Sequence, residues 1–391
     1  GVDWAHNMAG KGLEARPSVS WPEMMAFKRT FTDTMPSRIE AGFRKAGITP
    51  LHGEARFIGR DTITLNGETL RAKHFHIATG ARPMTLNIPG EDLLTTSTEF
   101  LELSERPDRI TFVGGGFIAM EFAHIAQRAG ASAVTVLEMA GRPLGPFDAD
   151  LVAMLVEAST ELGIDVQTEA KVLKVEKQGD EFAVSYETPS GIQVLTCDLV
   201  VHATGRVPNI DHLNLPAAGV DAGKRGIKVD AAMRTTNPAI FAAGDCADSG
   251  LNLTPVSAYE GRIAGKNLLA GKDARLVSYP PIPSVVFTLP PVATVGLSET
   301  AATEKGLEFD THFEKTSGWY SSMRVGATTS GFKVLVEQKT GLILGAHLIG
   351  PGAEEQINLF AMAMGAGLTA NQIKAMIFAY PSFASDIGSM V

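Results

Sequence analysis

The 391-residue sequence predicts an α/β protein with three parts, two related α/β domains and a C-terminal α+β domain. A glycine-rich turn, Gly114-Gly115-Gly116, stands between an apolar strand and an apolar helix, as in a strand–helix–strand unit. Two further segments, 78–80 and 203–205, both read Ala-Thr-Gly. Because each follows an apolar strand, the repeat indicates two related domains. A proline-rich stretch at 279–283 marks the start of the third part.

The composition is that of an ordinary soluble α/β protein. The chain is 45% hydrophobic and 20% charged, and its net charge of −9 argues against a nucleic-acid or anionic-membrane partner. No apolar run reaches the roughly 18–20 residues of a bilayer span, and the first residues lack the apolar core of a signal peptide. Two cysteines, Cys197 and Cys246, form no C-x-x-C pair and fit a reducing compartment. We therefore expect a cytoplasmic protein with no nucleic-acid partner, no membrane partner and no metal site.

The first elements in chain order are helical. The stretch to about Lys45 is predicted to be helical, and Trp21-Pro22 is a helix start because proline fits the first turn. Strands are predicted at residues 55–58, 62–65 and 75–78. Asn66-Gly67 is expected to form the hairpin turn between two strands.

The remaining elements follow from apolar periodicity. Residues 110–113 and 134–137 are predicted strands, and the helix between them, at 119–129, stops at Gly130. A helix at about 150–162 is followed by strands at 166–175 and 182–186 of a small antiparallel insertion, and residues 199–201 return to the parallel sheet. The C-terminal part is predicted to hold strands at 284–287, 293–296, 332–336 and 342–348, and helices at 353–367 and 369–379.

The glycine-rich turn has the pattern of a dinucleotide-binding site. Its first glycine permits a tight turn, its second lets the backbone approach a pyrophosphate, and Ala119 allows close packing of helix on strand. The pyrophosphate would sit on the unpaired N–H groups of the helix start. An acidic residue, Glu138, follows Gly116 by 22 positions, as the fingerprint requires. The sequence thus predicts a nicotinamide dinucleotide site at Gly114, Gly115, Gly116, Phe117, Ile118, Ala119 and Glu138.

Glu138 favours NAD over NADP. A carboxylate there accepts hydrogen bonds from the ribose hydroxyls and repels a 2′-phosphate. Arg142 could in principle hold a phosphate, but we interpret it as a solvated surface arginine. NADP stays open as the alternative.

A second signal is the apolar strand that ends in Gly244-Asp245, before a helix that begins near Thr254. A carboxylate at a strand exit is placed to bind polyol hydroxyls. The helix start offers N–H groups to an electron-rich ring edge. The alternative interpretation is a capped turn without a ligand.

Together these motifs resemble the pyridine nucleotide–disulfide oxidoreductases, which include glutathione reductase, dihydrolipoamide dehydrogenase and mercuric reductase. The resemblance covers nearly the whole chain, and residues 289–299 are similar to the opening of the family's dimerisation domain. It implies two Rossmann-like FAD/NAD-binding domains, the first incomplete, with a C-terminal α+β dimerisation domain and a homodimer. The implied boundaries are a remnant of the FAD-binding domain at 1–87, an NAD-binding domain at 88–209, a second part of the FAD-binding domain at 210–277, and the dimerisation domain at 278–391.

The resemblance also implies site residues. The flavin set is Ala55 at the adenine side, Thr79, Gly80, Arg206, Asp245 at the ribityl chain, and Thr254 at the pyrimidine edge. The NAD set gains Gly205 and Glu121. Phe117 matches an aromatic gate of the nicotinamide pocket, and Glu121 matches a glutamate that pairs with a lysine beside the flavin. Arg262 matches a substrate contact of glutathione reductase, although a structural role is equally open.

The sequence departs from the family pattern in three ways. It lacks the opening FAD fingerprint and its C-x-x-x-x-C, so we expect an N-terminally truncated chain that lacks about 50–70 residues of the intact parent. The catalytic His-Pro of the family is Tyr380-Pro381, and its paired glutamate is replaced near Ser385. A tyrosine is a poor base at neutral pH but a good donor or ligand, and an interface role is the alternative. Met139 and Gly145 stand where NADPH-dependent members carry arginines.

We expect an FAD-dependent oxidoreductase that takes hydride from NADH, or NADPH. In the intact parent, electrons would pass through a redox disulfide to a small disulfide-type acceptor, with Glu121 and Tyr380 as catalytic residues. The alternatives are a flavin-free NAD-binding and dimerisation module, an inactive fragment, or a flavoprotein of diaphorase or oxidase type.

Overall fold

The computed structural model describes residues 2–15, 17–270 and 274–391, and the chain divides into two compact units. Unit 1 comprises Gly1–Lys28, Leu86–Thr204 and Pro280–Val391, and unit 2 comprises Arg29–Thr85 and Gly205–Tyr279. The predicted helical stretch is confirmed in part, as α1 (Val2–Met8), α2 (Trp21–Thr32) and α3 (Met35–Lys45), but the described residues between α1 and α2 are not helical. Within the described ranges, no helix has both the length and the apolar composition of a membrane span.

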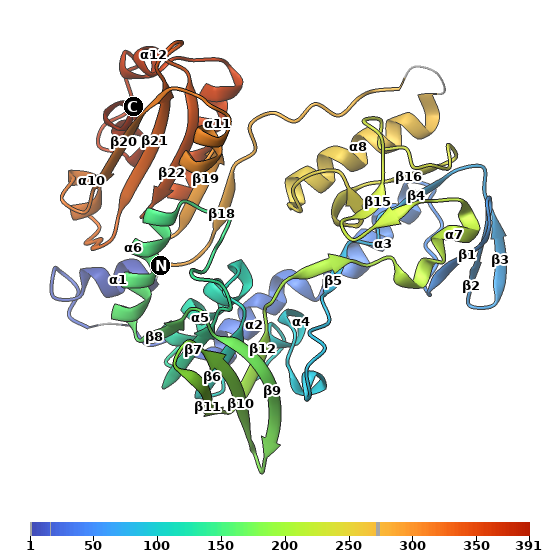
Figure 1. The fold of residues 1–391 in the computed structure, drawn as a ribbon, viewed down its shortest axis with the longest axis horizontal. Helices are drawn as coiled ribbons and strands as arrows, with labels where there is room; N and C mark the ends of the chain where they lie inside the picture. Colours follow the sequence, from blue (N-terminus) through green and yellow to red (C-terminus); the bar gives the residue numbers. More distant parts are fainter. Residues whose placement is uncertain (1, 16, 271–273) are drawn as a thin grey trace. The chain divides into compact units, whose positions relative to one another are not determined.

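Unit 1 is built on a parallel sheet with the strand order β12-β6-β7-β8 (Figure 1). The strands are β6 (Arg109–Val113), β7 (Ala133–Leu137), β8 (Ile164–Gln167) and β12 (Leu199–His202), and α5 (Phe117–Arg128) connects β6 to β7. Four of the five residues of β6 are buried, which is typical of a strand covered on both faces. The predicted strand–helix–strand unit is therefore confirmed. Helix α5 ends just before Gly130, which takes a φ of 92°.

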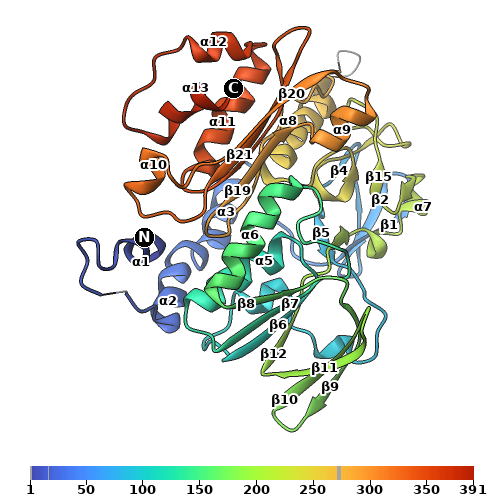
Figure 2. The same ribbon diagram turned by 60° about the vertical axis from the view of Figure 1, so that its left-hand side comes forward.

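Helix α6 (Ala149–Leu162) is shared by two sheets of unit 1. Figure 2 shows it between the parallel sheet and the C-terminal sheet. It contacts β8 on one side and β19, β21 and β22 on the other. One apolar core accordingly runs from Leu151 and Leu155 of α6 to Val292 and Ile349 of the C-terminal sheet.

The predicted insertion is present, but the predicted bounds of its first strand are wrong. Residues 166–175 were expected to form one antiparallel strand, whereas β8 belongs to the parallel sheet and β9 (Lys171–Gln178) starts the insertion. The chain turns between them at Glu169, whose φ is 53°. Strands β10 (Glu181–Thr188) and β11 (Gly191–Cys197) complete the order β11-β10-β9, and β11 was not predicted.

The C-terminal sheet is antiparallel, with the order β18-β19-β22-β21-β20. Its strands are β18 (Ser284–Val286), β19 (Val292–Gly296), β20 (Phe309–Lys315), β21 (Gly331–Glu337) and β22 (Ile343–Ile349). Helix α11 (Ala353–Gly365) packs on β19 and β22. The edge strand β20 was missed because most of its side chains are exposed and several are polar.

The predicted helix at 369–379 is too long. Helix α12 covers only Ala370–Lys374, with Thr369 and Gln372 in a capping box. Beyond it Ile377 is fully exposed, whereas Phe378 packs against the C-terminal core, so this stretch does not present the continuous apolar face of a helix. Tyr380 precedes a proline, which disfavours helical backbone at that residue.

Unit 2 joins two distant parts of the chain. Strand β4 (Phe75–Ile77) pairs in parallel with β16 (Ile240–Ala242), and β5 (Ala81–Pro83) pairs with β13 (Arg206–Pro208). Strands β1 (Ala55–Gly59), β2 (Thr62–Leu65) and β3 (Glu68–Arg71) form a separate antiparallel sheet. Both residues of the predicted hairpin turn, Asn66 and Gly67, have positive φ, which confirms that turn. Helix α8 (Thr254–Ala270) follows β16 and packs on it.

One small three-stranded sheet and one short helix also belong to unit 2. Strands β14 (Ala222–Gly223), β15 (Gly226–Lys228) and β17 (Ala247–Asp248) form one sheet, and α7 (Leu215–Ala218) packs on β1.

Candidate dinucleotide sites

The glycine turn after β6 needs glycine at its first position. Gly114 has a φ of 100°, and a Cβ there would lie 2.6 Å from the carbonyl oxygen of Ala203. Its N–H donates to the carbonyl of Leu137 at 2.8 Å, which ties the turn to the end of β7. Gly116 differs, because its φ is −75° and the nearest atom to an added Cβ is 3.8 Å away. One side of the turn is therefore open, as an approach to a pyrophosphate requires.

Glu138 lies directly against this turn. Its Oε2 accepts the N–H of Gly115 at 2.5 Å and its Oε1 accepts the N–H of Ala140 at 2.6 Å. A Cβ on Gly115 would come within 2.8 Å of Oε2, so a side chain at this position would displace the carboxylate. A carboxylate has about four acceptor positions, so Glu138 keeps capacity for ribose hydroxyls. The structure thus brings together the glycine turn and the acidic residue that the sequence paired.

Arg142 is not the solvated surface arginine that we expected. Its guanidinium donates to the carbonyls of Leu144 at 3.2 Å, Gly145 at 2.6 Å and Phe147 at 3.1 Å. These bonds are local, so they hold the loop that follows Glu138. The same loop returns to the glycine turn, because the N–H of Leu144 donates to the carbonyl of Gly115 at 2.9 Å. Met139 and Gly145 are both exposed beside it.

The first turns of α5 present the other predicted nucleotide residues. Phe117 is 53% exposed, Ile118 is half-buried and Ala119 is fully buried. Glu121 is half-buried, and its Oε1 accepts the N–H of Phe287 at 2.8 Å. Burial raises the pKa of Glu121 above its usual value, although the hydrogen bond from Phe287 opposes this.

Two residues further along α5 touch the same segment and were not singled out from the sequence. Leu289 donates its N–H to Nδ1 of His124 at 3.4 Å, and Arg128 donates to the carbonyl of Leu289 at 2.9 Å. Burial lowers the pKa of His124 to about 3, so its imidazole is neutral. Polar residues at 121, 124 and 128 fall on one face of a helix, and that spacing in an apolar helix was the available signal.

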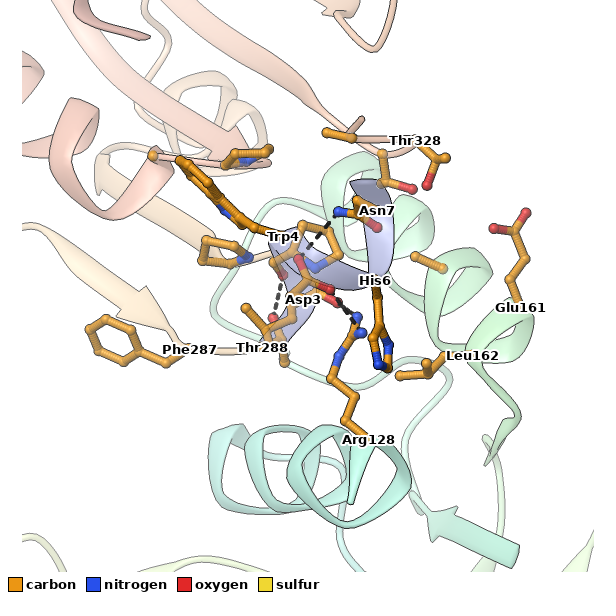
Figure 3. Close-up of a pocket in the computed structure, with 18 of the residues that line it drawn as sticks. Asp3, Trp4, His6, Asn7, Arg128, Glu161, Leu162, Phe287, Thr288 and Thr328 are labelled. Carbon is orange, nitrogen blue, oxygen red and sulfur yellow. Dashed lines mark hydrogen bonds and ion pairs between the residues drawn. The ribbon is translucent and has the colours of Figure 1, made fainter. Parts of the chain in front are cut away.

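A pocket of about 480 Å³ opens beside this contact (Figure 3). Arg128 and Asp3 meet in it at 2.8 Å, with Thr288 and His6 on its walls. The guanidinium Nε of Arg128 is buried without a hydrogen-bond partner among the residues that the structure describes. Among the hydrogen bonds described above, one joins this pocket to a predicted site residue: the bond from Phe287 to Glu121.

A buried ionic cluster lies at the start of α6. Lys333, with a side chain only 4% exposed, contacts Asp148 at 3.0 Å, Asp150 at 2.5 Å and Glu299 at 3.1 Å. Burial alone would lower the pKa of Lys333, but hydrogen bonds to these carboxylates outweigh it and raise that pKa above its ordinary value. Asp148 also caps α6, since it accepts the N–H groups of Asp150 and Leu151. The cluster thus fixes the end of the loop that starts at Glu138.

The predicted flavin residues lie in unit 2, where two parallel strands end at the same edge. Strand β4 leads into Thr79 and Gly80, and β16 leads into Gly244 and Asp245. Asp245 accepts a hydrogen bond from Ser257 at 3.2 Å. Thr79 Oγ1 is buried and has no partner within the described part of the chain. A buried hydroxyl without a partner is costly, and a polyol or phosphate group at this edge would supply one. These residues therefore fit the flavin that the sequence analysis assigned to them.

The other predicted residues are more scattered. The two Ala-Thr-Gly turns are followed by the paired strands β5 and β13, where Arg206 donates to the carbonyl of Ala81. Gly205 falls in unit 2 at the unit boundary, and Ala55 begins β1. Arg262 is exposed on α8. Tyr380 is 75% exposed in unit 1 and its ring stacks on Tyr320, with centroids 6.1 Å apart.

A buried acid that no sequence pattern indicated lies beside the Gly244–Asp245 turn. Glu260 on α8 is 1% exposed and accepts the N–H of Gly244 at 2.8 Å and the hydroxyl of Tyr279 at 2.5 Å. Nothing in the local pattern marks Glu260, because its partners are 16 and 19 positions away. Among residues 2–15, 17–270 and 274–391, no three His, Cys, Asp or Glu side chains are grouped as a metal ion requires.

Comparison with known proteins identifies related chains. Residues 8–261 match the pyridine nucleotide-disulphide oxidoreductase family, and residues 282–391 match its dimerisation domain. Mercuric reductases from Bacillus cereus and Staphylococcus aureus are 36% and 35% identical over 87% of this chain, which spans 54% and 62% of their lengths. Dihydrolipoyl dehydrogenase from Geobacillus stearothermophilus is 30% identical over 93% of this chain and 78% of the relative.

A solved structure has the same fold. The HOCl-induced flavoprotein disulfide reductase RclA from Escherichia coli superposes with a TM-score of 0.88 and 26% identity, over 100% of this chain and 89% of that one. The predicted fold class and the resemblance are thereby confirmed.

Proposed function

Because the chain belongs to the pyridine nucleotide-disulphide oxidoreductase family, we propose that it is an FAD-dependent oxidoreductase that takes hydride from NADH. Members of this family use FAD and NAD(P)H. The observation that carries the proposal is the hydrogen bond from the glycine turn to Glu138 within unit 1, which supports a ribose and pyrophosphate site there. The electron acceptor we propose is a small disulfide.

The preference for NADH over NADPH rests on charge around Glu138. Its carboxylate would accept hydrogen bonds from the ribose hydroxyls and would repel a 2′-phosphate. Arg142 commits three of its five N–H donors to backbone carbonyls of its own loop, which holds the guanidinium there. The exposed side chain of Met139 offers no compensating charge.

The flavin, when bound, would accept the hydride and pass electrons on. Within unit 2 we assign Asp245 to its ribityl hydroxyls, and Thr79, Gly80, Arg206, Thr254 and Ala55 to the rest of the cofactor. Within unit 1 we assign Phe117 to gating the nicotinamide pocket and Glu121 to nucleotide binding and catalysis. Gly205 stays a predicted nucleotide contact. Cys197 and Cys246 are both buried free thiols, and we assign neither a redox role. Tyr380 we assign to donating a proton or a hydrogen bond to the acceptor, and Arg262 to contacting it.

Flavin uptake and reduction test this function. The purified chain is expected to turn yellow with FAD and to be bleached anaerobically by NADH, at a concentration about tenfold below that needed with NADPH. Glu138→Gln removes the charge and keeps one of the two acceptor oxygens, so the preference for NADH should shrink in that variant. A chain that binds NADH but takes up no FAD would instead be a flavin-free nucleotide-binding module. Bleaching without any disulfide reduction would indicate a diaphorase or oxidase.

We also propose a homodimer formed through residues 282–391, which match the family's dimerisation domain. Large apolar side chains are exposed on this part of the chain: Met323, Met362, Met376, Ile377 and Tyr380. A surface of this kind is expected to be buried in a partner.

Light scattering is expected to give twice the 41.4 kDa chain mass. Ile377→Asp should shift the chain toward monomer, because a charge would be buried in the interface. Ile192→Asp is the matched control, since Ile192 is also exposed but lies on β11 of the insertion. Monomer at every concentration of the unaltered chain contradicts the proposal.

A further inference from the structure

Glu260 is a buried carboxylate that has only neutral donors as hydrogen-bond partners. Its side chain accepts from the backbone N–H of Gly244 and from the hydroxyl of Tyr279, and no ion pair to it occurs in the described ranges. Burying an acid without a cation is costly in free energy. A buried acid of this kind indicates a role beyond packing, because an apolar side chain would fill the same space at a lower cost.

The amide that Glu260 binds belongs to the turn that leads to Asp245. Gly244 has a φ of 71°, and an added Cβ would lie 3.1 Å from the side chain of Ser257. Ser257 in turn donates to Asp245. Two residues three positions apart on α8, Ser257 and Glu260, thus hold two consecutive residues of the turn.

Tyr279 holds Glu260 from the other side. Its hydroxyl lies 2.5 Å from Glu260 Oε1 and 3.3 Å from the carbonyl of Ser249. Burial, together with the neighbouring Glu260, raises the pKa of Tyr279 well above its usual range, so the phenol stays protonated and remains a donor. Its ring also faces Gly250, where an added Cβ would be 3.5 Å from the ring. Tyr279 therefore braces both the acid and the loop before α8.

We propose that Glu260 and Tyr279 are positioning residues for FAD, which act by fixing the Gly244–Asp245 turn. The inference rests on the proposed flavin function and adds two residues that do not touch the cofactor themselves. The carboxylate of Glu260 accepts the N–H of Gly244, and this hydrogen bond fixes the turn to α8. The orientation of the next residue, Asp245, is set by that turn. Without the Tyr279 hydroxyl the carboxylate loses a donor, and the turn loses its fixed geometry.

Tyr279→Phe against Tyr259→Phe tests the inference. Both substitutions remove one phenolic hydroxyl, but within the described part of the chain that of Tyr259 hydrogen-bonds only to the backbone of Ser278. FAD affinity, measured by the quenching of flavin fluorescence, is expected to fall about 10-fold or more in Tyr279→Phe and less than about threefold in Tyr259→Phe. NADH affinity should be the same in both, because that site lies in unit 1.

Glu260→Gln and hydrogen exchange complete the test. Glu260→Gln keeps the shape of the side chain. It should also weaken FAD binding at least about 10-fold, because it removes the negative charge of Glu260 and one of the two acceptor oxygens. Amide exchange of residues 240–250 in the cofactor-free chain should quicken in Tyr279→Phe and Glu260→Gln, but not in Tyr259→Phe. Unchanged FAD affinity and exchange in both variants overturn this inference alone. Failure of the unaltered chain to take up FAD overturns the proposed function and this inference with it.

Discussion

Lys333→Met is expected to destabilise the chain by about 3–5 kcal/mol, because it leaves buried carboxylate charge without its cation. Asp148, the partner of Lys333, has a side chain that is also only 4% exposed. Asp150 and Glu299 are about half exposed, so water can solvate them in part, but it cannot reach Asp148 in the same way. The loss should appear in the free energy of unfolding measured with denaturant.

Two further variants separate charge from packing in this cluster. Lys333→Met combined with Asp148→Asn should recover part of the loss, because asparagine still caps α6 but carries no charge. Lys315→Met, at an exposed lysine on the neighbouring β20, should change stability by less than about 0.5 kcal/mol. A loss below about 1 kcal/mol in Lys333→Met would show that the cluster does not carry the stability assigned to it.

Gly114→Ala is expected to cost several kcal/mol of stability and to abolish NADH binding. The residue has a φ of 100°, and the added Cβ would lie 2.6 Å from the backbone of Ala203. A left-handed conformation costs about 1–3 kcal/mol for a residue other than glycine, and a backbone clash of this size adds a similar amount. The turn would have to open, which would move Gly115 away from Glu138.

Gly116→Ala is the matched control two residues away. At a φ of −75°, with 3.8 Å to the nearest atom, its Cβ fits the free protein, so stability should change by less than about 1 kcal/mol. NADH titrations should nevertheless show weaker binding, because the methyl occupies the approach to the pyrophosphate. If both variants lose stability equally, the distinction drawn here between a folding glycine and a binding glycine is wrong.

Local patterns were enough to predict most elements and the pairing of Glu138 with the glycine turn. That pair is separated by a single strand–helix–strand unit, whose geometry is fixed by its own periodicity. The errors arose where tertiary contacts decide. Residues 375–379 are apolar enough for a helix, but no core covers Ile377. The boundary between β8 and β9 depends on a turn at Glu169, for which the local sequence gives no strong signal.

The contacts around the site were beyond sequence reasoning for a different reason. Arg128 meets Leu289 at a separation of 161 residues, and Lys333 meets Asp150 at 183. No periodicity connects residues so far apart. The prediction for Arg142 was wrong although its partners are local. They are backbone carbonyls, which every residue carries, so the sequence does not show which of them an arginine will bind.

The pairing of β4 with β16 has a consequence for synthesis on the ribosome. Ile77 pairs with Ala242, about 165 residues later, whereas the parallel sheet of unit 1 is contained between residues 109 and 202. At about 5–20 residues per second, the first part of unit 2 waits about 10–30 s for its partner strand. The sheet of unit 1 is translated entirely within that interval. Strand β4 is therefore made before the parallel sheet of unit 1 but can pair only after that whole sheet has been translated, so its edge stays unpaired in the nascent chain for that interval.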